Sequence, residues 1–419
     1  MSKLTYMEKL LEGVEVEWKP IADIADIYGG LTGKSKADFE SGNAKYISYK
    51  NIFNNIDVDP GQLELVKVSE NERQHKVRYG DILFTGSSEI AVEAGMSSAV
   101  TIDFKEPVYL NSFSFGVRFN DDVKLMPEFS KYLFRSRFMR ADIAKSASGV
   151  TRFNVSKARF KKILVPIPCP DNPEKSLAIQ AEIVRILDAF TAMTAELTAE
   201  LTAELNMRKK QYNYYRDQLL SFEEGEVEWK TLGDLAENLD SKRKPITSGL
   251  REAGEIPYYG ASGIVDYVKD YIFDGDYLLV SEDGANLLAR NTPIAFSISG
   301  KTWVNNHAHV LKFETYAERK YVEYYLNSID LTPYISGAAQ PKLNKKNLES
   351  INIPNPAPKE KERIVAILDK FDSLTCSIKE GLPREIELRQ KQYEYYRDLL
   401  LSFPASPAGG PKSHSDEAA

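Results

Sequence analysis

The sequence KQYNYYRDQLLSF, from Lys210 to Phe222, is written a second time as KQYEYYRDLLLSF, from Lys391 to Phe403. A second phrase, IVRILDAF from Ile183 to Phe190, returns as IVAILDKF from Ile364 to Phe371. Both pairs are offset by 181 residues (391 − 210 and 364 − 183). Internal repeats at a fixed offset indicate that one structural unit is used twice. The chain is therefore predicted to be two copies of one plan.

Shorter repeats show the order of parts within each copy. VEVEWK at 14–19 returns as GEVEWK at 225–230, and VPIP at 165–168 returns as IPNP at 353–356. Each copy thus runs from an arm through a variable region to a helix. The chain begins with an arm and stops after a helix, so the N-terminal arm reads as the continuation of the C-terminal helix. We expect a cyclic, pseudo-two-fold arrangement with both ends close together.

Apolar residues in the repeated phrase are spaced three, four and three residues apart, as in a heptad seam. The two long helices are predicted to pack on each other as an antiparallel coiled coil. These aromatic residues are interpreted as packing residues. The predicted spacer and interface positions are Leu197, Leu201, Leu205, Tyr212, Tyr215, Leu219, Phe222, Tyr393, Tyr396, Leu400 and Phe403.

The stretch TAELTAELTAEL, residues 194–205, lies between the repeated phrases. Four helical residues add about 6 Å and about 400° of rotation, a net turn of about 40°. One base pair of DNA advances about 3.4 Å and turns roughly 34–36°. We hypothesise that the number of TAEL copies sets a spacing along DNA, one base pair per copy. The second copy has equal length here, with Ile378, Leu382 and Ile386 opposite the three leucines, and Gly381 and Pro383 are expected to break or restart its helix.

The variable regions mix short β-rich runs with Gly, Asn and Ser turns. We therefore predict an α+β fold, with two mixed α/β domains joined by the two long helices. The Pro/Gly/Ser-rich end is expected to be disordered. The predicted segments are an N-terminal domain with its arm at 1–160, a central helical spacer at 161–222, a second domain at 223–350, a distal helical region at 351–403 and a tail at 404–419.

Composition limits the functional class. With 419 residues the chain suits two to four domains, and its two cysteines suit a reducing cytosol. The N-terminus has no signal-peptide pattern, and no apolar run is long enough to span a bilayer. We therefore expect a cytoplasmic protein that has no membrane partner. Net charge is −7, yet residues 131–162 hold ten Lys or Arg and one acid. Such a cluster is either solvated surface or a nucleic-acid contact.

A search for catalytic motifs finds little. GGLTGKS at 29–35 would need glycine at Tyr28 to be a phosphate-binding loop, so an NTPase is disfavoured. His307 and His309 alternate along a probable strand and could face one side, and without further ligands a polar contact is favoured over a metal site. Acids after two similar GDxL strands, such as Glu282, could be catalytic, but at the tip of a strand they are more often loop caps or, near DNA, acceptors for a cytosine amine.

Three phrases give the chain a family resemblance: PYYGASGIVDYV at 257–268, NNHAHVLKF at 305–313 and SGAAQPKLNKKNLESINIPNP at 336–356. With the paired helices and the TAEL repeat, they resemble the specificity subunit of type I restriction–modification enzymes, a bacterial defence, in the branch with a TAEL spacer. The resemblance spans nearly the whole chain. The first copy departs from it, with RFNVS at 152–156 where the second has QPKLN at 340–344.

The resemblance implies a non-catalytic chain whose two target recognition domains each read half of a split, asymmetric site on double-stranded DNA. It implies two methyltransferase subunits and motor–endonuclease subunits as partners. S-adenosylmethionine, ATP and Mg²⁺ would belong to those partners, with no cofactor or metal in this chain. The implied DNA-binding residues are Lys34, Lys36, Tyr49, Lys50, Asn51, Ser87, Ser88, Glu89, Thr151, Arg152, Asn154, Lys157, Lys242, Arg243, Lys244, Tyr259, Ser262, Glu282, Asn286, Asn305, His307, Gln340, Lys342, Asn344 and Lys345.

Two other classes of function stay open at this point. A coiled-coil scaffold whose two domains bind proteins or sugars fits the acidic net charge. A standalone nuclease or NTPase would require activity from the isolated chain, and no motif supports it.

Overall fold

The computed structural model describes residue 10 and residues 15–223, 225–337, 340–375 and 381–404. It divides into two compact units: residues 1–198 with 388–419 form unit 1, and residues 199–387 form unit 2. The predicted α+β class is confirmed. Ile378 and the tail beyond Pro404 lie outside the described residues. Within the described residues, no helix is both long enough and apolar enough to cross a membrane.

Helix α7 (Pro173–Leu220) is one continuous element of 48 residues that carries IVRILDAF, the TAEL repeat and the first KQYxYYRD phrase. The second copy has two helices instead, α12 (Pro358–Thr375) and α13 (Leu382–Leu400). Gly381 has φ +86° and Pro383 lies in the first turn of α13, where its missing N–H costs nothing. The predicted restart of the helix at Gly381 and Pro383 is therefore confirmed.

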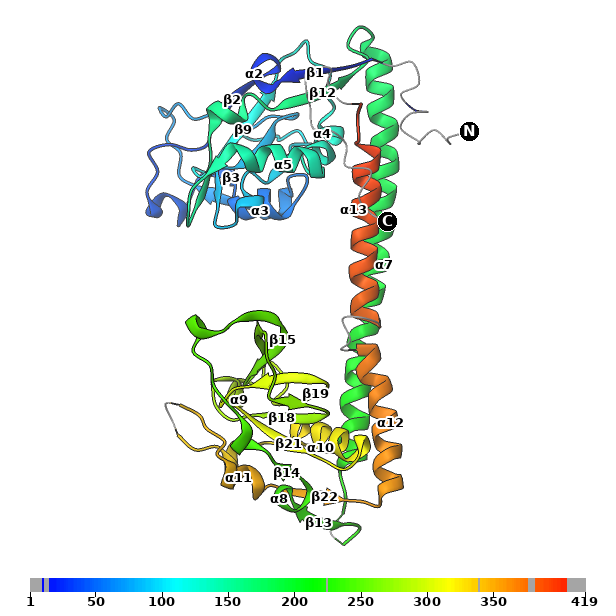
Figure 1. Ribbon diagram of the computed structural model, residues 1–419. Coiled ribbons are helices and arrows are strands. Elements are labelled where there is room, and N and C mark those ends of the chain that lie inside the picture. The colour runs from blue at the N-terminus through cyan, green and yellow to red at the C-terminus, as the bar shows by residue number, and fades with distance from the viewer. Residues whose placement is uncertain (1–9, 11–14, 224, 338–339, 376–380, 405–419) are drawn as a thin grey trace. The chain divides into compact units, whose positions relative to one another are not determined.

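In the coiled coil, the KQYxYYRD phrase of each copy packs on the IVxILDxF phrase of the other copy. In unit 1, Phe190 stacks on Tyr396 with ring centroids 5.7 Å apart, and Thr191 Oγ1 lies 2.9 Å from the Tyr393 hydroxyl. Because 190 pairs with 396 and 191 with 393, α7 and α13 are antiparallel, side by side in Figure 1. In unit 2, Tyr215 of α7 stacks on Phe371 of α12 at 5.6 Å. The predicted antiparallel coiled coil therefore forms by exchange of phrases between the two copies.

The domain of unit 1 is built on a four-stranded sheet of order β2-β9-β5-β7, with two three-stranded sheets beside it. Its core joins sheet residues such as Phe84 and Phe115 to Leu187 of α7 and Leu400 of α13. The main bounds are β2 Ala25–Gly29, β3 Ala44–Ile47, α3 Tyr49–Asn54, β4 Leu63–Val66, β5 Ile82–Thr85, β6 Ser87–Ser88, β7 Ser97–Ala99, β8 Val108–Leu110, β9 Ser114–Phe119, α4 Pro127–Leu133, α5 Arg137–Ser146, β10 Ala147–Ser148, β11 Phe153–Val155 and α6 Lys157–Phe160.

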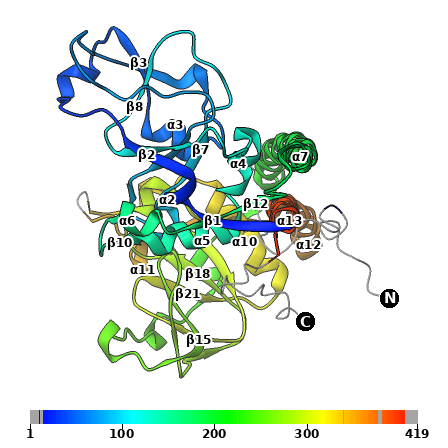
Figure 2. The same ribbon diagram turned by 90° about the horizontal axis from the view of Figure 1, so that it is seen from above.

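The domain of unit 2 has two four-stranded sheets, β14-β21-β18-β19 and β16-β15-β20-β17. The first sheet packs with α10 against Leu368 of α12 and Leu220 of α7. The bounds are β14 Glu237–Asn238, β15 Ala253–Gly260, β16 Gly263–Val268, β17 Phe273–Asp274, β18 Tyr277–Ser281, α9 Asn286–Ala289, β19 Ala295–Ile298, β20 Lys301–Val304, β21 Ala308–Lys312, α10 Tyr316–Ser328 and α11 Lys345–Glu349. Figure 2 looks along the long helices. In this view β15 and β21 lie in the body of the domain, and α12 lies at its edge.

Each domain is entered and left through one antiparallel strand pair, which explains the short repeats. Strand β1 (Val16–Pro20) pairs with β12 (Leu164–Pro168), and β13 (Glu228–Thr231) pairs with β22 (Asn352–Asn355). In unit 1 the Trp18 indole N–H donates to the Pro404 carbonyl at 2.9 Å. The described parts of the N-terminal arm and of the C-terminal end therefore meet, as the cyclic arrangement predicts.

The same hydrogen bond fastens each domain to its own helix. The Tyr132 hydroxyl donates to Asp188 at 2.6 Å, and the Tyr324 hydroxyl donates to Asp369 at 2.6 Å. Asp188 and Asp369 are equivalent at the 181-residue offset. Burial, and then the hydrogen bond to the carboxylate, raise the pKa of both tyrosines above the ordinary value. Both hydroxyls therefore stay protonated donors at neutral pH.

Candidate functional site

Two segments occupy equivalent positions in the two domains, each directly before a short helix, and the one in unit 1 includes strand β11. In unit 1 the RFNVS segment ends at Ser156, whose hydroxyl caps α6 by accepting from the Arg159 N–H at 3.5 Å. In unit 2 the QPKLN segment ends at Asn344, whose side chain caps α11 by accepting from the Asn347 N–H at 2.9 Å. We call these segments, residues 152–156 and 340–344, the reading loops.

Strand register aligns the residues beneath the two loops. Thr85 and Val280 are each the fifth residue after the glycine of a Gly-Asp pair. Thr85 pairs with Ser114 and Val280 pairs with His309. Two residues further along, Ser87 of unit 1 corresponds to Glu282 of unit 2. Where unit 1 has two serines, unit 2 therefore has a histidine and a glutamate.

In unit 1 this position is an open hollow of about 440 Å³. At its edge Arg152 Nε donates to Ser87 Oγ at 3.0 Å, and the Tyr49 hydroxyl donates to the Ser87 carbonyl at 2.9 Å. The Lys157 ammonium lies 5.8 Å from the ring of Phe115. Two cations thus stand at a hollow of mixed polar and apolar lining that is open to solvent. The residues that line it are Gly86, Ser87, Ser112, Phe113, Ser114, Phe115, Arg152, Asn154, Val155 and Lys157.

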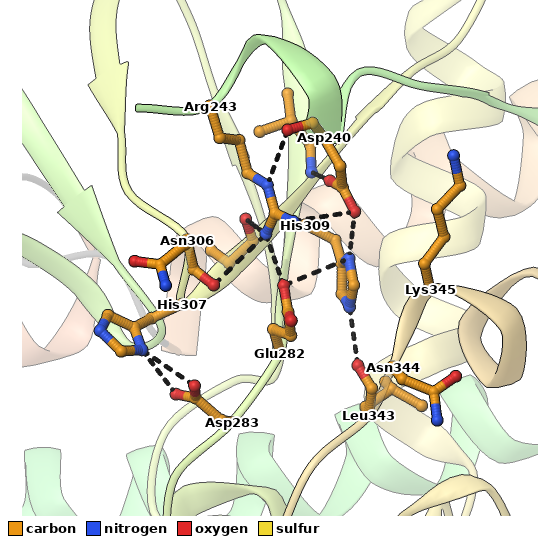
Figure 3. A network of polar contacts seen from close by, with 12 residues as sticks. Asp240, Arg243, Glu282, Asp283, Asn306, His307, His309, Leu343, Asn344 and Lys345 are labelled. Atoms are coloured by element: carbon orange, nitrogen blue, oxygen red, sulfur yellow. Dashed lines mark hydrogen bonds and ion pairs between the residues drawn. The ribbon is translucent and has the colours of Figure 1, made fainter. Parts of the chain in front are cut away.

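In unit 2 the same position is filled by a network of charges, shown in Figure 3. The His309 side chain is 1% exposed. Its Nδ1 lies 2.6 Å from Asp240 Oδ2, and its Nε2 lies 2.7 Å from the Leu343 carbonyl of the reading loop. Arg243 donates to Glu282 at 2.6 Å and pairs with Asp240 at 3.2 Å.

The cations of this network keep both carboxyl groups ionised. Burial acts to raise the pKa of Asp240, but hydrogen bonding and charge from His309, the Val310 N–H and Arg243 outweigh it and lower that pKa. Burial also acts to raise the pKa of Glu282, but hydrogen bonds from Arg243 and Lys342 outweigh burial, so that pKa is lowered. A carboxylate that already accepts from two cations is poorly placed to accept from a cytosine amine. Glu282 therefore orients Lys342, whose ammonium lies 3.0 Å away and whose side chain is 51% exposed.

Asp240, Glu282 and His309 could each offer a ligand atom to a metal ion, since these atoms lie within 4.8 Å of one another. Their hydrogen bonds argue against that use. The guanidinium of Arg243 already lies on both carboxylates, and His309 Nε2 faces a backbone carbonyl. The donor set is that of an ion-pair network.

Not every predicted residue lies at the reading loops. In unit 1 the Lys34 side chain is 4% exposed in an ion pair with Glu72, and Asn51 is fully buried and holds the Asp59 backbone. Ser88 is buried in β6 beside the loop, where it pairs with Phe153. Four other predicted residues of this unit are exposed or half-buried: Lys36, Lys50, Glu89 and Thr151.

In unit 2 Asn286 closes its own turn by two hydrogen bonds with Thr292, and buried Asn305 accepts from the His307 N–H. Tyr259 is half-buried and its carbonyl accepts from the Asn305 N–H. Around the reading loop the structure gathers Arg243, Glu282, Asn344 and Lys345, as Figure 3 shows. Lys342 joins them through its ion pair with Glu282. Four further predicted residues have exposed side chains: Lys242, Lys244, Ser262 and Gln340.

The sequence pattern missed two parts of this network. His307 and His309 do not share a face: His307 precedes β21 and is 52% exposed beside Asp283, whereas His309 is buried. The expectation of a common side was wrong because the strand begins only at Ala308. Asp240 was not predicted at all, because the register that brings β14 beside β21 cannot be read from its own neighbours.

Comparison with known proteins agrees with this architecture. The model of a family described as "Type I restriction modification DNA specificity domain" matches residues 13–207 and again 224–388. The specificity subunit of the type I restriction enzymes EcoR124I/EcoR124II from Escherichia coli is 39% identical, over 96% of this chain and 98% of that protein. The EcoprrI specificity subunit, also from Escherichia coli, is 37% identical over 91% of this chain and 93% of that protein.

One solved structure supports the fold. It comes from work on complex assembly and conformational transition of the type I R-M system, and it covers 92% of this chain and 97% of its own, with a TM-score of 0.63 at 15% identity. The relatives are named as specificity subunits, which favours DNA over the protein- or sugar-binding scaffold.

Proposed function

We propose a division of labour for this chain, which belongs to the DNA specificity subunits of type I restriction–modification systems. The chain is a non-catalytic DNA-recognition subunit. Each domain reads one half of a bipartite site through its reading loop, and the helices hold the two domains apart. One observation supports this proposal above the others. Equivalent loops lie at the same place in the two domains but have chemically different surroundings, a hollow in unit 1 and an ion-pair network in unit 2.

The cations at the loops suit two different tasks on DNA. Lysine mostly holds phosphates as a point charge, whereas arginine, or a lysine held in one direction, can also donate hydrogen bonds to a guanine edge in the major groove. We assign Lys157 and Lys345 to the phosphate backbone. Arg152 and Lys342 are assigned to base edges, because a neighbouring side chain orients each of them: Ser87 for Arg152 and Glu282 for Lys342.

The proposal places the chain in the branch whose spacer is a TAEL repeat. The repeat lies within the continuous helix α7, and its leucines 197, 201 and 205 are all half-buried. An apolar residue at every fourth position keeps one face of a helix towards a partner. Each copy would then lengthen the spacer without touching either reading loop.

Partner subunits complete the enzyme in this proposal. Two methyltransferase subunits dock on the chain and bring S-adenosylmethionine, and motor–endonuclease subunits bring ATP and Mg²⁺. The two units offer equivalent parts, which suits two copies of one partner.

A methylation map tests the proposal. The chain would be expressed with its methyltransferase partner in a host that lacks DNA methylation, and modified positions would be located by long-read sequencing. The expected result is one bipartite motif with two different half-sites and a constant spacer. Methylation that is absent, or that lacks any two-part motif, would contradict the proposed reading. The chain without partners should show neither nuclease nor NTPase activity.

A further inference from the structure

His309 makes two hydrogen bonds that only one protonation state can satisfy. Both of its ring nitrogens face oxygen atoms, those of Asp240 and of the Leu343 carbonyl, at 2.6 and 2.7 Å. A carbonyl oxygen can only accept, and Asp240 is held as a carboxylate by Arg243 and by the Val310 N–H at 3.0 Å. A neutral imidazole has one N–H, so it would leave one lone pair against an oxygen. The imidazolium donates to both.

The surrounding charges also favour the imidazolium. The side chains of Asp240 and Glu282 are 9% and 11% exposed, and Arg243, 12% exposed, is the buried arginine that faces them. Glu282 lies 3.8 Å from His309 Nδ1. Lys342 also reaches Glu282, but from the solvent side. Two buried carboxylates beside one buried guanidinium leave one buried negative charge to be balanced, which favours a second buried cation.

The second hydrogen bond of His309 acts on the reading loop itself. Leu343 lies between Lys342 and Asn344, its N–H donates to the Glu282 carbonyl at 2.8 Å, and its carbonyl accepts from His309. Its side chain is fully buried. The loop is thus held at its centre by the strand that carries His309 and by the segment that carries Glu282. Its flanking side chains, Lys342 and Asn344, take their direction from this point.

Unit 1 has uncharged side chains at the two positions that correspond to His309 and Glu282. At the place of His309 it has Ser114, whose hydroxyl donates to Asn111 Oδ1 at 3.1 Å. At the place of Glu282 it has Ser87. The two reading loops therefore differ in what supports them, although their helix caps are equivalent.

We propose that doubly protonated His309 is a positioning residue that clamps the second reading loop, so that reading of one half-site depends on this buried charge and reading of the other does not. The inference rests on the proposed function for its effect on DNA, and on the protein alone for the protonation state. His75, an exposed histidine of unit 1 beside the ring of Tyr28 and outside the predicted DNA contacts, provides the control.

The protonation state is measured first, on the full chain with its methyltransferase partner. Selective ¹⁵N labelling of histidine gives signals from four histidines in this chain. His309→Gln and His307→Gln assign the two of interest, and labelling only this chain removes partner signals. The expected result at neutral pH is a His309 ring with protons on both nitrogens. A neutral tautomer would overturn the proposal, whether or not DNA is recognised.

The effect on recognition is measured with duplexes that carry the mapped site, or the site with one half scrambled. His309→Gln should lower the preference for the intact second half by about tenfold or more, as expected for a lost charged hydrogen bond. Preference for the first half should stay unchanged. His75→Gln, at an exposed histidine outside the predicted DNA contacts, should leave both preferences unchanged.

A second substitution keeps the proposal testable if His309→Gln fails to fold. Asp240→Asn keeps the shape of the side chain and removes the anion that faces His309, so it should weaken preference for the second half alone. If folded variants of both kinds kept the full preference for the second half, the proposal would be wrong. If the wild-type complex ignored both halves, the proposed function would fail instead, and the ring measurement would still stand.

Discussion

Lys157 is the residue through which the electrostatic part of binding can be tested. Its ammonium stands beside the hollow of unit 1 and faces an aromatic ring, and none of the described carboxylates forms an ion pair with it. Lys157→Ala should weaken binding to all sequences alike and lower the slope of log affinity against log salt by about one. Salt titrations of gel-shift affinity measure this slope.

The matched control for Lys157 is Lys105→Ala, an exposed lysine of unit 1 away from the hollow. It should leave the slope as it is. A Lys157→Ala complex with the wild-type slope would remove this residue from the phosphate contacts.

Asp240 gives a prediction about acid stability. Its pKa is lowered because hydrogen bonds and charge from His309, Val310 N–H and Arg243 outweigh burial, which acts in the opposite direction. A lowered pKa means that the carboxylate stabilises the folded state above its unfolded pKa, about 3.9, and that this contribution disappears as pH falls through the lower, native value. Asp240→Asn should therefore be less stable at neutral pH, and its stability should fall less on acidification.

Urea unfolding at several pH values tests this expectation, followed by hydrogen exchange in unit 2. Asp270→Asn is the control, because this residue of the same unit is exposed. A parallel loss of stability with pH in wild type and Asp240→Asn would contradict the assignment.

Between elements, the duplicated plan predicts matched effects in the two units. Leu187 of α7 and Leu368 of α12 are equivalent at the 181-residue offset, and both are fully buried. Each packs in the core of its own unit. Truncation to alanine should cost about 2–5 kcal/mol of unfolding free energy in that unit.

Native-state hydrogen exchange can read the two units separately. Leu187→Ala should lower protection in unit 1, and Leu368→Ala should do so in unit 2. Leu388→Ala, at a position 42% exposed, should change stability by less than about 0.5 kcal/mol. A single substitution that lowered protection equally in both units would argue against separate cores.

At the same scale, the sequence carried more information on helices than on domains. The 181-residue repeat predicted the helices, and the breakers Gly381 and Pro383 predicted the restart, because these depend on local sequence. The strand pairs that frame each domain were not predicted. The repeat did not predict that each seam packs on the other phrase of the other copy. Nor could it align Ser114 with His309, since that equivalence rests on which strands pair and in which register. The network around Asp240 was missed for the same reason.

For the whole molecule, the TAEL repeat predicts how far apart two half-sites lie. Deletion of one copy, residues 202–205, should shorten the spacer by one base pair and leave both half-sites unchanged. Four residues make one full helical turn plus about 40°, which is close to the rotation of one base pair, roughly 34–36°. Methylation mapping of the variant measures both quantities at once.

A variant that replaces the same four residues with another helix-forming phrase, keeping the leucine, is the control and should keep the original spacer. A deletion variant with the original spacer would exclude the repeat as a ruler.

The paired strands at the root of each domain have a consequence for how new specificities arise. Strands β1 and β12 lie side by side where the chain enters and leaves the first domain, and β13 and β22 do so for the second. Each domain also keeps its buried charges and its Tyr–Asp fastening within its own unit. Recombination between related genes at these two strands would therefore trade one domain as a cassette. The host would acquire a new recognition sequence in a single genetic event, while the second half-site and the spacing stayed as inherited.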